Sequence, residues 1–441
     1  MSMWKIEFKG IYNSAKACVI LTSLIMIIIL YKQLGGRAPL QFIKSLNLIN
    51  STCYGTLFPG NVNSESNWGA VDLENTIFVI SAYYVKERAR IFIIGAKHVY
   101  SNSAVCQIWY TDPDNKVRSI QQTQAKVVAP IGRNKYKYIS TIFACPIDSE
   151  ETPTHVSLVM HSCDNPLNLL RIRDVSKPIK YERRFTVCLS PVHKFDALFK
   201  FVEWIELNRI LGAEKILIYN HSTGVNVDDV IKYYLNMNIV EVINWKLPFP
   251  LSKIEYFAQK SALNDCIFKN RNVSEFIINI DKDEFIIPHS ENVLNWSQMI
   301  EKFDKNYAGY LVKNTFYRTD WTDQQLNFTE KVLAEKLGLV SLTHFEHEKK
   351  IFSAEHRSKY FARTAFVEFG NIHEIPRGRV YTIPEEVGLL HHYRKEKHEK
   401  PQQKVKDMTV LVKYGQRLIE NVQEALKEIS KLNLNVSLII T

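Results

Sequence analysis

The sequence lacks several motifs, and each absence argues against one class of ligand or site. It contains no arginine-rich arm and no zinc-finger spacing, which argues against nucleic acid as a partner. Its 7 cysteines include no C-x-x-C pair, so no cysteine metal site is predicted. No G-x-G-x-x-G follows the first strand of its α/β region, and this absence disfavours a dinucleotide cofactor. The net charge of +10 instead favours other anionic ligands or surfaces.

One long apolar run stands near the N-terminus. Residues 17–31 (ACVILTSLIMIIILY) carry no charge and are bracketed by Lys16 and Lys32. As a helix this run spans ~22 Å, which suits a thin secretory membrane. Lys5 and Lys9 also precede it, so the positive-inside rule predicts a type II signal anchor with the rest of the chain in the lumen. A cleaved signal peptide is the alternative, because the run length and the following "GGRA" also fit that class.

The cysteines fit an oxidising lumen. Cys18 lies in the apolar run, and the other cysteines can form up to three disulfides, although their pairing cannot be read from the sequence. These cysteines are Cys53, Cys106, Cys145, Cys163, Cys188 and Cys266. Cys266 is expected to be a disulfide or core residue rather than a nucleophile, because no His stands near it in the sequence.

Patterning divides the rest of the chain. Short β-type runs such as IFVISAYYV, separated by turn signals such as DPDN, predict an antiparallel β-rich domain. From Tyr181, strands alternate with helices, which predicts a mostly parallel sheet with helices on both faces and ligands beyond the carboxyl ends of its strands. The first of these helices is expected to be amphipathic and to stop at Gly212. The predicted segments are a cytosolic tail (1–16), the anchor (17–31), a stem (32–68), the β-rich domain (69–178), the α/β domain (179–400) and a C-terminal helix packed on it (401–441).

The run SEFIINIDKDEFIIP (274–288) is the centre of the predicted site. Its apolar part predicts a buried strand, and in a strand Asp281 and Asp283 point to one face while Glu284 points to the other. Two carboxylates at a strand end suit a hard divalent cation that also binds phosphate oxygens. A polar strand end that turns into solvent is the alternative.

Several blocks in this order resemble glycosyltransferase family 92. They include EWIELNRILGAEKILIYN, AQKSALNDCIFKNR, FIINIDKDEFIIP, EHRSKYFARTAFVEFGNIHE and LLHHYR, and the resemblance covers roughly residues 70–400. It implies a single-pass type II Golgi membrane enzyme whose α/β domain is of the GT-A type, a Rossmann-like mixed sheet with flanking helices. It also implies a UDP-sugar donor and Mn²⁺ or another divalent cation. Characterised members are β-galactosyltransferases, some of which extend core fucose, so UDP-galactose and an N-glycan or glycoprotein acceptor are expected.

The resemblance also suggests roles for single residues. Asp283 is expected to be a metal ligand, and Asp281 either a second ligand or a contact to the nucleotide ribose. A further ligand in GT-A enzymes often is a His near the domain end, here His391 or His392, with surface histidines as the alternative.

The sequence also offers candidates for the catalytic base and for the nucleotide contacts. An inverting transfer needs a carboxylate to deprotonate the acceptor hydroxyl, and Asp320 in FYRTDWTD or Glu374 in GNIHEIP is the candidate. Ser190 and His193 end the first strand of the α/β domain, where the uracil and ribose would bind. Residues Asn264 and Asp265 either contact the nucleotide or brace the metal-binding strand.

Two other function classes stay open. An inactive family member could act as a lectin-like glycan-binding protein. A metal phosphoesterase could use DKDE, but it would need further carboxylate and His clusters at short range that the sequence does not contain. The sequence predicts no oligomeric state.

Overall fold

The computed structural model describes residues 58–59, 67–101, 103–131, 135–178, 180–321, 328–395 and 403–432. All of these belong to one compact unit, residues 56–441. The predicted tail and anchor and nearly all of the predicted stem lie outside the described residues. Among the residues that are described, no helix is both long and apolar enough to cross a membrane.

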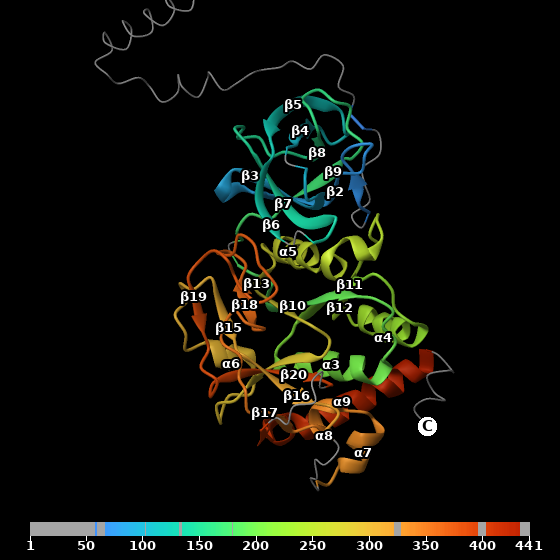
Figure 1. Cartoon of the computed structure of the whole chain (residues 1–441), viewed down its shortest axis with the longest axis vertical. Coiled ribbons are helices and arrows are strands. Elements are labelled where there is room, and N and C mark those ends of the chain that lie inside the picture. The colour runs from blue at the N-terminus through green and yellow to red at the C-terminus, as the bar shows by residue number, and fades with distance from the viewer. Residues whose placement is uncertain are drawn as a thin grey trace, which may run out of the picture. The chain divides into compact units, whose positions relative to one another are not determined.

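A nine-stranded sheet forms the N-terminal part, and its strands β2 to β9 are labelled in Figure 1. The strand order is β5-β4-β8-β9-β2-β3-β7-β6, and β1 pairs with β2. Its pairs are antiparallel except for β2 and β9, which are parallel. A disulfide joins Cys106 to Cys145, on β4 and β7. The strands are β1 (Gly69–Ala70), β2 (Ile77–Val85), β3 (Arg90–His98), β4 (Val105–Thr111), β5 (Val117–Gln124), β6 (Lys126–Ile131), β7 (Tyr138–Pro146), β8 (His155–Val159) and β9 (Leu170–Asp174).

A seven-stranded mixed sheet follows, in the order β12-β11-β10-β13-β18-β15-β19. Its first four strands are parallel, because helices connect them in sequence, whereas β18 is antiparallel to both β13 and β15. The strands are β10 (Arg183–Val192), β11 (Lys215–Asn220), β12 (Val240–Asn244), β13 (Ser274–Ile280), β15 (Gly309–Val312), β18 (Lys359–Arg363) and β19 (Val380–Thr382).

A smaller sheet continues from the end of β13. It has five strands in the order β14-β20-β16-β17-β21. They are β14 (Glu284–Pro288), β20 (Gly388–Arg394), β16 (Asn314–Arg318), β17 (Glu346–Glu348) and β21 (Lys404–Lys406). Short helices α6 (Trp296–Ile300), α7 (Lys331–Lys336) and α8 (Val340–Thr343) lie between these strands in the chain.

Helices α3 (Leu198–Leu211) and α4 (Val225–Asn236) cover one face of the seven-stranded sheet, and α9 (Thr409–Leu432) packs outside them (Figure 1). The prediction of an amphipathic first helix was wrong, because α3 buries Glu203 and Glu206 as well as its apolar side chains. The reason is α9, which covers the outer side of α3 that the local pattern would leave in water. The helix ends as predicted at Gly212, whose φ of +124° few other residues adopt.

Helix α5 (Gln259–Lys269) lies on the other face, against the nine-stranded sheet (Figure 1). Its Phe268 stacks on Phe92 of β3 with ring centroids 4.9 Å apart, and Ser261 donates a hydrogen bond of 2.9 Å to the Gly95 carbonyl. A disulfide joins Cys266 of α5 to Cys188 of β10, as the expectation of a disulfide or core role for Cys266 allowed. One apolar core therefore extends from the β-rich part into the α/β part.

Candidate active site

Asp281 and Asp283 lie in a turn between two sheets, which we call the acidic turn. Strand β13 ends at Ile280, residues 281–283 form the turn, and β14 begins at Glu284. The alternation argument for Asp281 and Asp283 was therefore wrong, because the strand stops before them. The turn is fixed by its backbone: the Glu284 amide donates to the Asp281 carbonyl at 3.1 Å, and the Trp204 indole of α3 donates to the same oxygen at 3.0 Å.

Asp283 faces a histidine from the neighbouring strand. In the register of β14 and β20, Glu284 pairs with His392. This places His392 Nε2 3.4 Å from Asp283 Oδ2 and His392 Nδ1 3.3 Å from Glu284 Oε1. Burial raises the pKa of Asp283, but the contact with His392 outweighs it and the net pKa is lowered. Asp283 is thus an ionised carboxylate at neutral pH, with 41% of its side chain exposed.

Lys359 of β18 forms ion pairs with Asp281 and Glu284. Its fully buried Nζ lies 2.9 Å from Asp281 Oδ2 and 3.1 Å from Glu284 Oε2. Burial opposes the charge on Asp281, but Lys359 outweighs it and lowers the pKa of Asp281 to about 2. The two carboxylates in turn raise the pKa of Lys359 despite its burial. Glu284 was expected to face away; it lies in the same cluster because the turn reorients the chain.

His391 and His392 point to opposite faces of the small sheet, as successive residues of a strand do. His392 meets Asp283, whereas His391 lies with its Nε2 2.8 Å from His289 Nε2. The sequence could not decide which histidine faces the acidic turn. The structure brings His392 to Asp283 and places His391 elsewhere.

A cavity of about 1170 Å³ opens over the acidic turn. Part of its lining is both aromatic and basic. The Phe316 ring is approached by the guanidinium groups of Arg318, Arg394 and Arg357, whose carbons lie 4.7, 5.3 and 5.2 Å from the ring centroid. A cavity with carboxylates on one part of its lining and guanidinium groups on another suits a ligand that carries a metal-bound diphosphate.

Ser190 lies in this cavity and is linked to the acidic turn. The Gln259 amide nitrogen donates to Ser190 Oγ at 2.6 Å and to Asp281 Oδ1 at 3.2 Å. His193 is not part of the lining, but its ring packs on Phe257, which is, with centroids 4.9 Å apart. The end of β10 thus lies beside the turn, where the sequence placed the nucleotide.

Asn264 and Asp265 lie away from this cavity, on α5. Asn264 is buried and bonds both backbone groups of Gly370, accepting at 2.9 Å and donating at 3.0 Å. Asp265 accepts from the hydroxyls of Tyr83 at 2.6 Å and Tyr219 at 2.8 Å. These contacts are those of bracing residues, which was the alternative reading of the pair.

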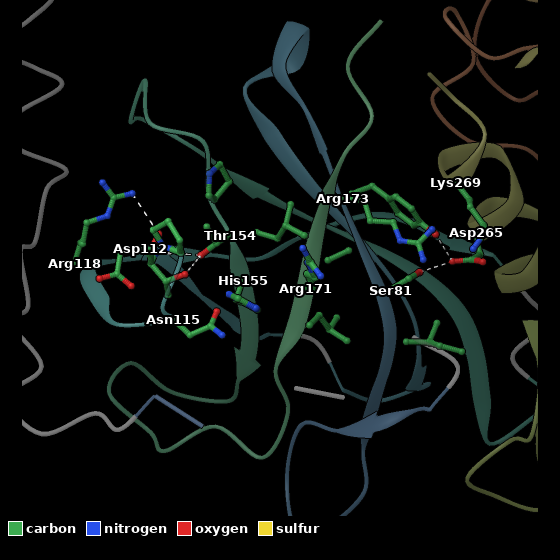
Figure 2. A pocket seen from close by; sticks show the side chains of 18 of the residues that line it. Ser81, Asp112, Asn115, Arg118, Thr154, His155, Arg171, Arg173, Asp265 and Lys269 are labelled. Carbon is green, nitrogen blue, oxygen red and sulfur yellow. Dashed lines mark hydrogen bonds between the residues drawn. The ribbon is translucent and has the colours of Figure 1, made fainter. Parts of the chain in front are cut away.

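A second cavity, of about 860 Å³, lies beside Asp265 (Figure 2). Ser81 and Asp265 stand at one end of it, while Arg118, Asp112 and Thr154 stand at the other. None of the residues that line it belongs to the acidic turn. It is separate from the candidate active site.

The two predicted base candidates do not line the cavity over the turn. Asp320 is exposed beyond the end of β16, and Glu374 accepts a hydrogen bond of 3.0 Å from Asn371. Two carboxylates of the lining were missed, Glu348 and Glu355. Glu348 is tied to Arg318, whose Nε donates to it at 2.7 Å. Glu355 is exposed, lies in the loop before β18 and has a φ of +67°. Its loop has no periodicity that would mark it in the sequence.

His373 lines the cavity beside Lys359 and provides a pH test. Burial and the nearby Lys359 lower the pKa of His373 to about 4, whereas a free imidazole titrates near 6.5. Between these values the unfolded chain binds more protons than the folded chain, so the free energy of unfolding falls as the pH falls. Because the ring is part exposed, its share is at most about 3 kcal/mol. We expect His373→Gln to show a weaker loss of stability between pH 7 and 4 in urea unfolding.

His161→Gln is the control for this measurement, because His161 is 84% exposed. It should keep the pH dependence of the wild type. A difference between wild type and His373→Gln that stays constant across this range would contradict the assigned pKa.

The donor set of the turn fits a divalent cation. Asp283 Oδ2 and His392 Nε2 are 3.4 Å apart, close to the roughly 3 Å that separates neighbouring ligands of an ion with bonds of about 2.1 Å. A carboxylate with an imidazole suits Mn²⁺ better than Mg²⁺, which prefers oxygen alone. Asp281 Oδ2 is engaged by Lys359, which leaves Asp283 and His392 as the ligand pair.

Comparison with known proteins agrees with the sequence resemblance. A model of glycosyltransferase family 92 matches residues 183–430, more than half of the chain. Beta-1,4-galactosyltransferase galt-1 of Caenorhabditis elegans is 30% identical over 124 residues, which are 27% of this chain and 29% of that protein. Glycosyltransferase family 92 protein F55C10.4 of the same species is 25% identical over 132 residues, 28% of this chain and 24% of that protein. The matched part is thus less than a third of either relative.

Solved structures give weaker likenesses. S. aureus TarS 1–349 in complex with UDP-GlcNAc is 11% identical, with a TM-score of 0.27, and the match covers 58% of this chain and 70% of that one. Glucosyl-3-phosphoglycerate synthase from Mycobacterium tuberculosis, in complex with Mn²⁺, UDP and glucosyl-3-phosphoglycerate, is 11% identical with a TM-score of 0.25. That match covers 56% of this chain and 80% of the synthase.

Proposed function

Because the chain belongs to glycosyltransferase family 92, we propose that it transfers a sugar from a nucleotide-sugar donor to a glycan with the help of a divalent cation. The observation that carries the proposal is the meeting of Asp283 and His392 at a cavity that is also lined by Arg318, Arg357 and Arg394. This arrangement supplies a metal position and a cationic lining for a diphosphate leaving group. A lectin-like protein would need neither a metal position nor a cationic lining for a diphosphate. The transfer assay described below distinguishes this alternative from the enzyme.

Galactose from UDP-galactose is the proposed donor sugar, and an N-glycan carrying core fucose is the proposed acceptor. The relative named as a beta-1,4-galactosyltransferase supports the donor, over the part of the chain that it matches. Mn²⁺ is the proposed ion, and transfer with inversion to a β linkage is the proposed outcome. We further propose a Golgi location, with residues 17–31 as a type II anchor and the described residues in the lumen.

The residues of the site have different proposed roles in this reaction. Asp283 and His392 would hold the cation, which when bound offsets the negative charge of the leaving diphosphate. Asp281, fixed by Lys359 and Gln259, is placed to accept a hydrogen bond from a ribose hydroxyl. Arg357, which lines the same cavity, adds a cation for the phosphates.

The experiment that tests the function is a transfer assay with the purified full-length chain. UDP-galactose, UDP-glucose and UDP-N-acetylglucosamine are offered with fucosylated and non-fucosylated N-glycans, with and without Mn²⁺. We expect Mn²⁺-dependent transfer of galactose to the fucosylated acceptor. Transfer of another sugar would overturn the donor, and glycan binding without transfer or metal dependence would favour the lectin-like alternative.

Glu355 is the proposed catalytic base. Of the carboxylates that line the cavity, Asp281, Glu284 and Glu348 are paired with cations and Asp283 faces His392, which leaves Glu355 with no ion pair among the described residues. We expect Glu355→Gln to lower kcat by about 10²- to 10⁴-fold with little change in UDP binding.

Glu374→Gln is the matched control, because Glu374 lies outside the cavity lining and bonds Asn371. It should keep kcat within about 3-fold of the wild type, as expected for a residue outside the reaction. A large loss in Glu374→Gln together with a normal Glu355→Gln would reverse the assignment.

A further inference from the structure

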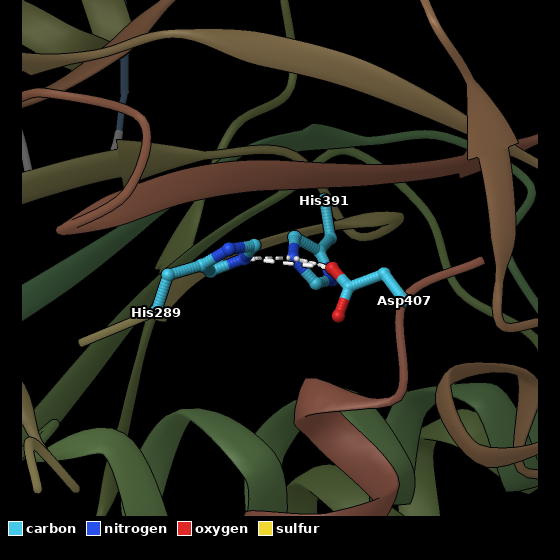
Figure 3. Close-up of side chains that lie close together, drawn as sticks. All are labelled: His289, His391 and Asp407. Carbon is cyan, nitrogen blue, oxygen red and sulfur yellow. Dashed lines mark hydrogen bonds and ion pairs between the residues drawn. The ribbon is translucent and has the colours of Figure 1, made fainter. Parts of the chain in front are cut away.

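Two histidines and an aspartate from distant parts of the chain meet in a second cluster (Figure 3). Because His391 and His392 alternate along β20, this cluster lies on the face of the strand opposite to the acidic turn. We call His289, His391 and Asp407 the imidazole–carboxylate cluster. His289 directly follows β14, His391 is in β20, and Asp407 lies between β21 and α9. Figure 3 shows their polar ends directed at one another.

The distances in the cluster are those of ligands around one ion. The Nε2 atoms of the two histidines are 2.8 Å apart, and Asp407 Oδ2 lies 3.6 Å from that of His289 and 3.5 Å from that of His391. Zinc bonds of about 2.0–2.1 Å in a tetrahedron separate the ligand atoms by about 3.3 Å. The triangle therefore needs an adjustment of only about 0.5 Å between the two imidazoles to hold such an ion.

The chemistry of the cluster also suits a metal. His391 is 1% exposed and His289 and Asp407 are 17% and 11% exposed. Burial favours neutral imidazoles, which offer lone pairs, and the carboxylate brings the negative charge that a cation needs. Two imidazoles with one carboxylate are a ligand set typical of Zn²⁺, whereas Ca²⁺ and Mg²⁺ prefer oxygen alone.

Neighbouring groups hold the cluster in this geometry. The Tyr317 hydroxyl donates to Asp407 Oδ2 and lies 3.1 Å from His391 Nε2. The Thr409 amide at the start of α9 donates to Asp407 Oδ1 at 2.8 Å. Hydrogen bonds of this kind orient the side chains that bind the ion directly in metal sites. The cluster is thus braced on the side of β16 and on the side of α9.

We propose that His289, His391 and Asp407 bind one Zn²⁺ ion that fastens the start of α9 to the small sheet. Lys413 already ties the same two segments, because its Nζ donates to the carbonyls of Pro288 and Ser290 at 3.0 and 2.7 Å. The ion would add a second link between the residues after β14 and the beginning of α9. It is separate from the cation of the acidic turn, because His391 and His392 project from opposite faces of β20.

The test is the metal content of the purified full-length chain, measured by mass spectrometry after Zn²⁺ is supplied and excess is removed. We expect about one Zn²⁺ per chain in the wild type and in Asp283→Asn, and less than about 0.2 in His289→Ala and in Asp407→Asn. His161→Ala, at an exposed histidine of the β-rich part, is the matched control and should retain the ion. Wild-type protein with less than about 0.1 Zn²⁺ per chain would overturn the proposal, as would Zn²⁺ that is lost only in Asp283→Asn.

A second measurement works on the wild type and does not depend on the folding of a variant. Co²⁺ in place of Zn²⁺ should give the intense visible absorption of a tetrahedral site with nitrogen and oxygen ligands. Removal of the ion by a chelator should lower the melting temperature by several degrees, and returned Zn²⁺ should restore it. An unchanged melting temperature with no tetrahedral spectrum would show a hydrogen-bonded cluster without a metal.

Discussion

Asp283→Asn is expected to lower kcat/KM for sugar transfer by at least about 100-fold, because the proposed cation loses its anionic ligand. The amide keeps the shape of the side chain but removes the anionic oxygen that faces His392 Nε2 at 3.4 Å. The fold should survive, because the structural contact of Asp283 is made by its carbonyl, which accepts from the Tyr393 amide at 2.8 Å. The measurement is kcat/KM over a range of Mn²⁺ concentrations, with calorimetric UDP binding in parallel.

The control for this variant is Asp304→Asn. Asp304 has a similar exposure, 45%, and lies 3.9 Å from Arg379, away from the acidic turn. Its loss should leave kcat/KM within about 2-fold of the wild type. If Asp283→Asn behaves like Asp304→Asn and Mn²⁺ still strengthens UDP binding, the cation does not bind at the turn.

Lys359→Met is expected to have the largest effect on stability, a loss of about 3–5 kcal/mol in the free energy of unfolding. Lys359 is fully buried and is the cation that Asp281 and Glu284 share. Methionine has a similar volume, so the loss comes from removing the cation that Asp281 and the buried Glu284 share and not from a cavity. Urea unfolding at pH 7 measures it.

Two further variants sharpen this prediction. Lys313→Met removes a lysine whose pair with Glu385 is wide, 3.9 Å, and part exposed, so it should cost less than about 1 kcal/mol. Lys359→Met combined with Glu284→Gln should recover part of the loss, because the buried charge of Glu284 is removed together with its lysine. Equal stability of Lys359→Met and Lys313→Met would show that the buried cation is not needed.

The parallel arrangement of strands β10 to β13 was accessible from the sequence, because they alternate with helices and each strand is a compact apolar run. The position of the acidic turn followed from the same pattern. The predicted directions of the acidic side chains were wrong, because strand alternation was extended past Ile280, where β13 ends. The turn after Ile280 instead places Glu284 beside Lys359. Nothing local in the sequence marks Lys359 as the partner, because it lies more than seventy residues further along the chain.

The other misses also come from contacts between distant segments. The burial of α3 on both sides depends on α9, which follows it by about two hundred residues. The choice between His391 and His392 depends on the register of β20 against β14, which periodicity does not give. Glu355 has no pattern around it, since it lies in a loop whose place is set by the strands on either side.

The position of α5 limits how the chain can be shortened. A fragment that begins at residue 179 would lose Tyr83 and Ser81, which bond Asp265, and would expose the apolar side of α5 that Phe92 covers. Such a fragment would be a poor candidate for expression, because it would present a bare hydrophobic surface and invite aggregation. The α/β part therefore needs the nine-stranded sheet, which covers the apolar side of α5. A soluble fragment for crystallisation would have to retain this sheet.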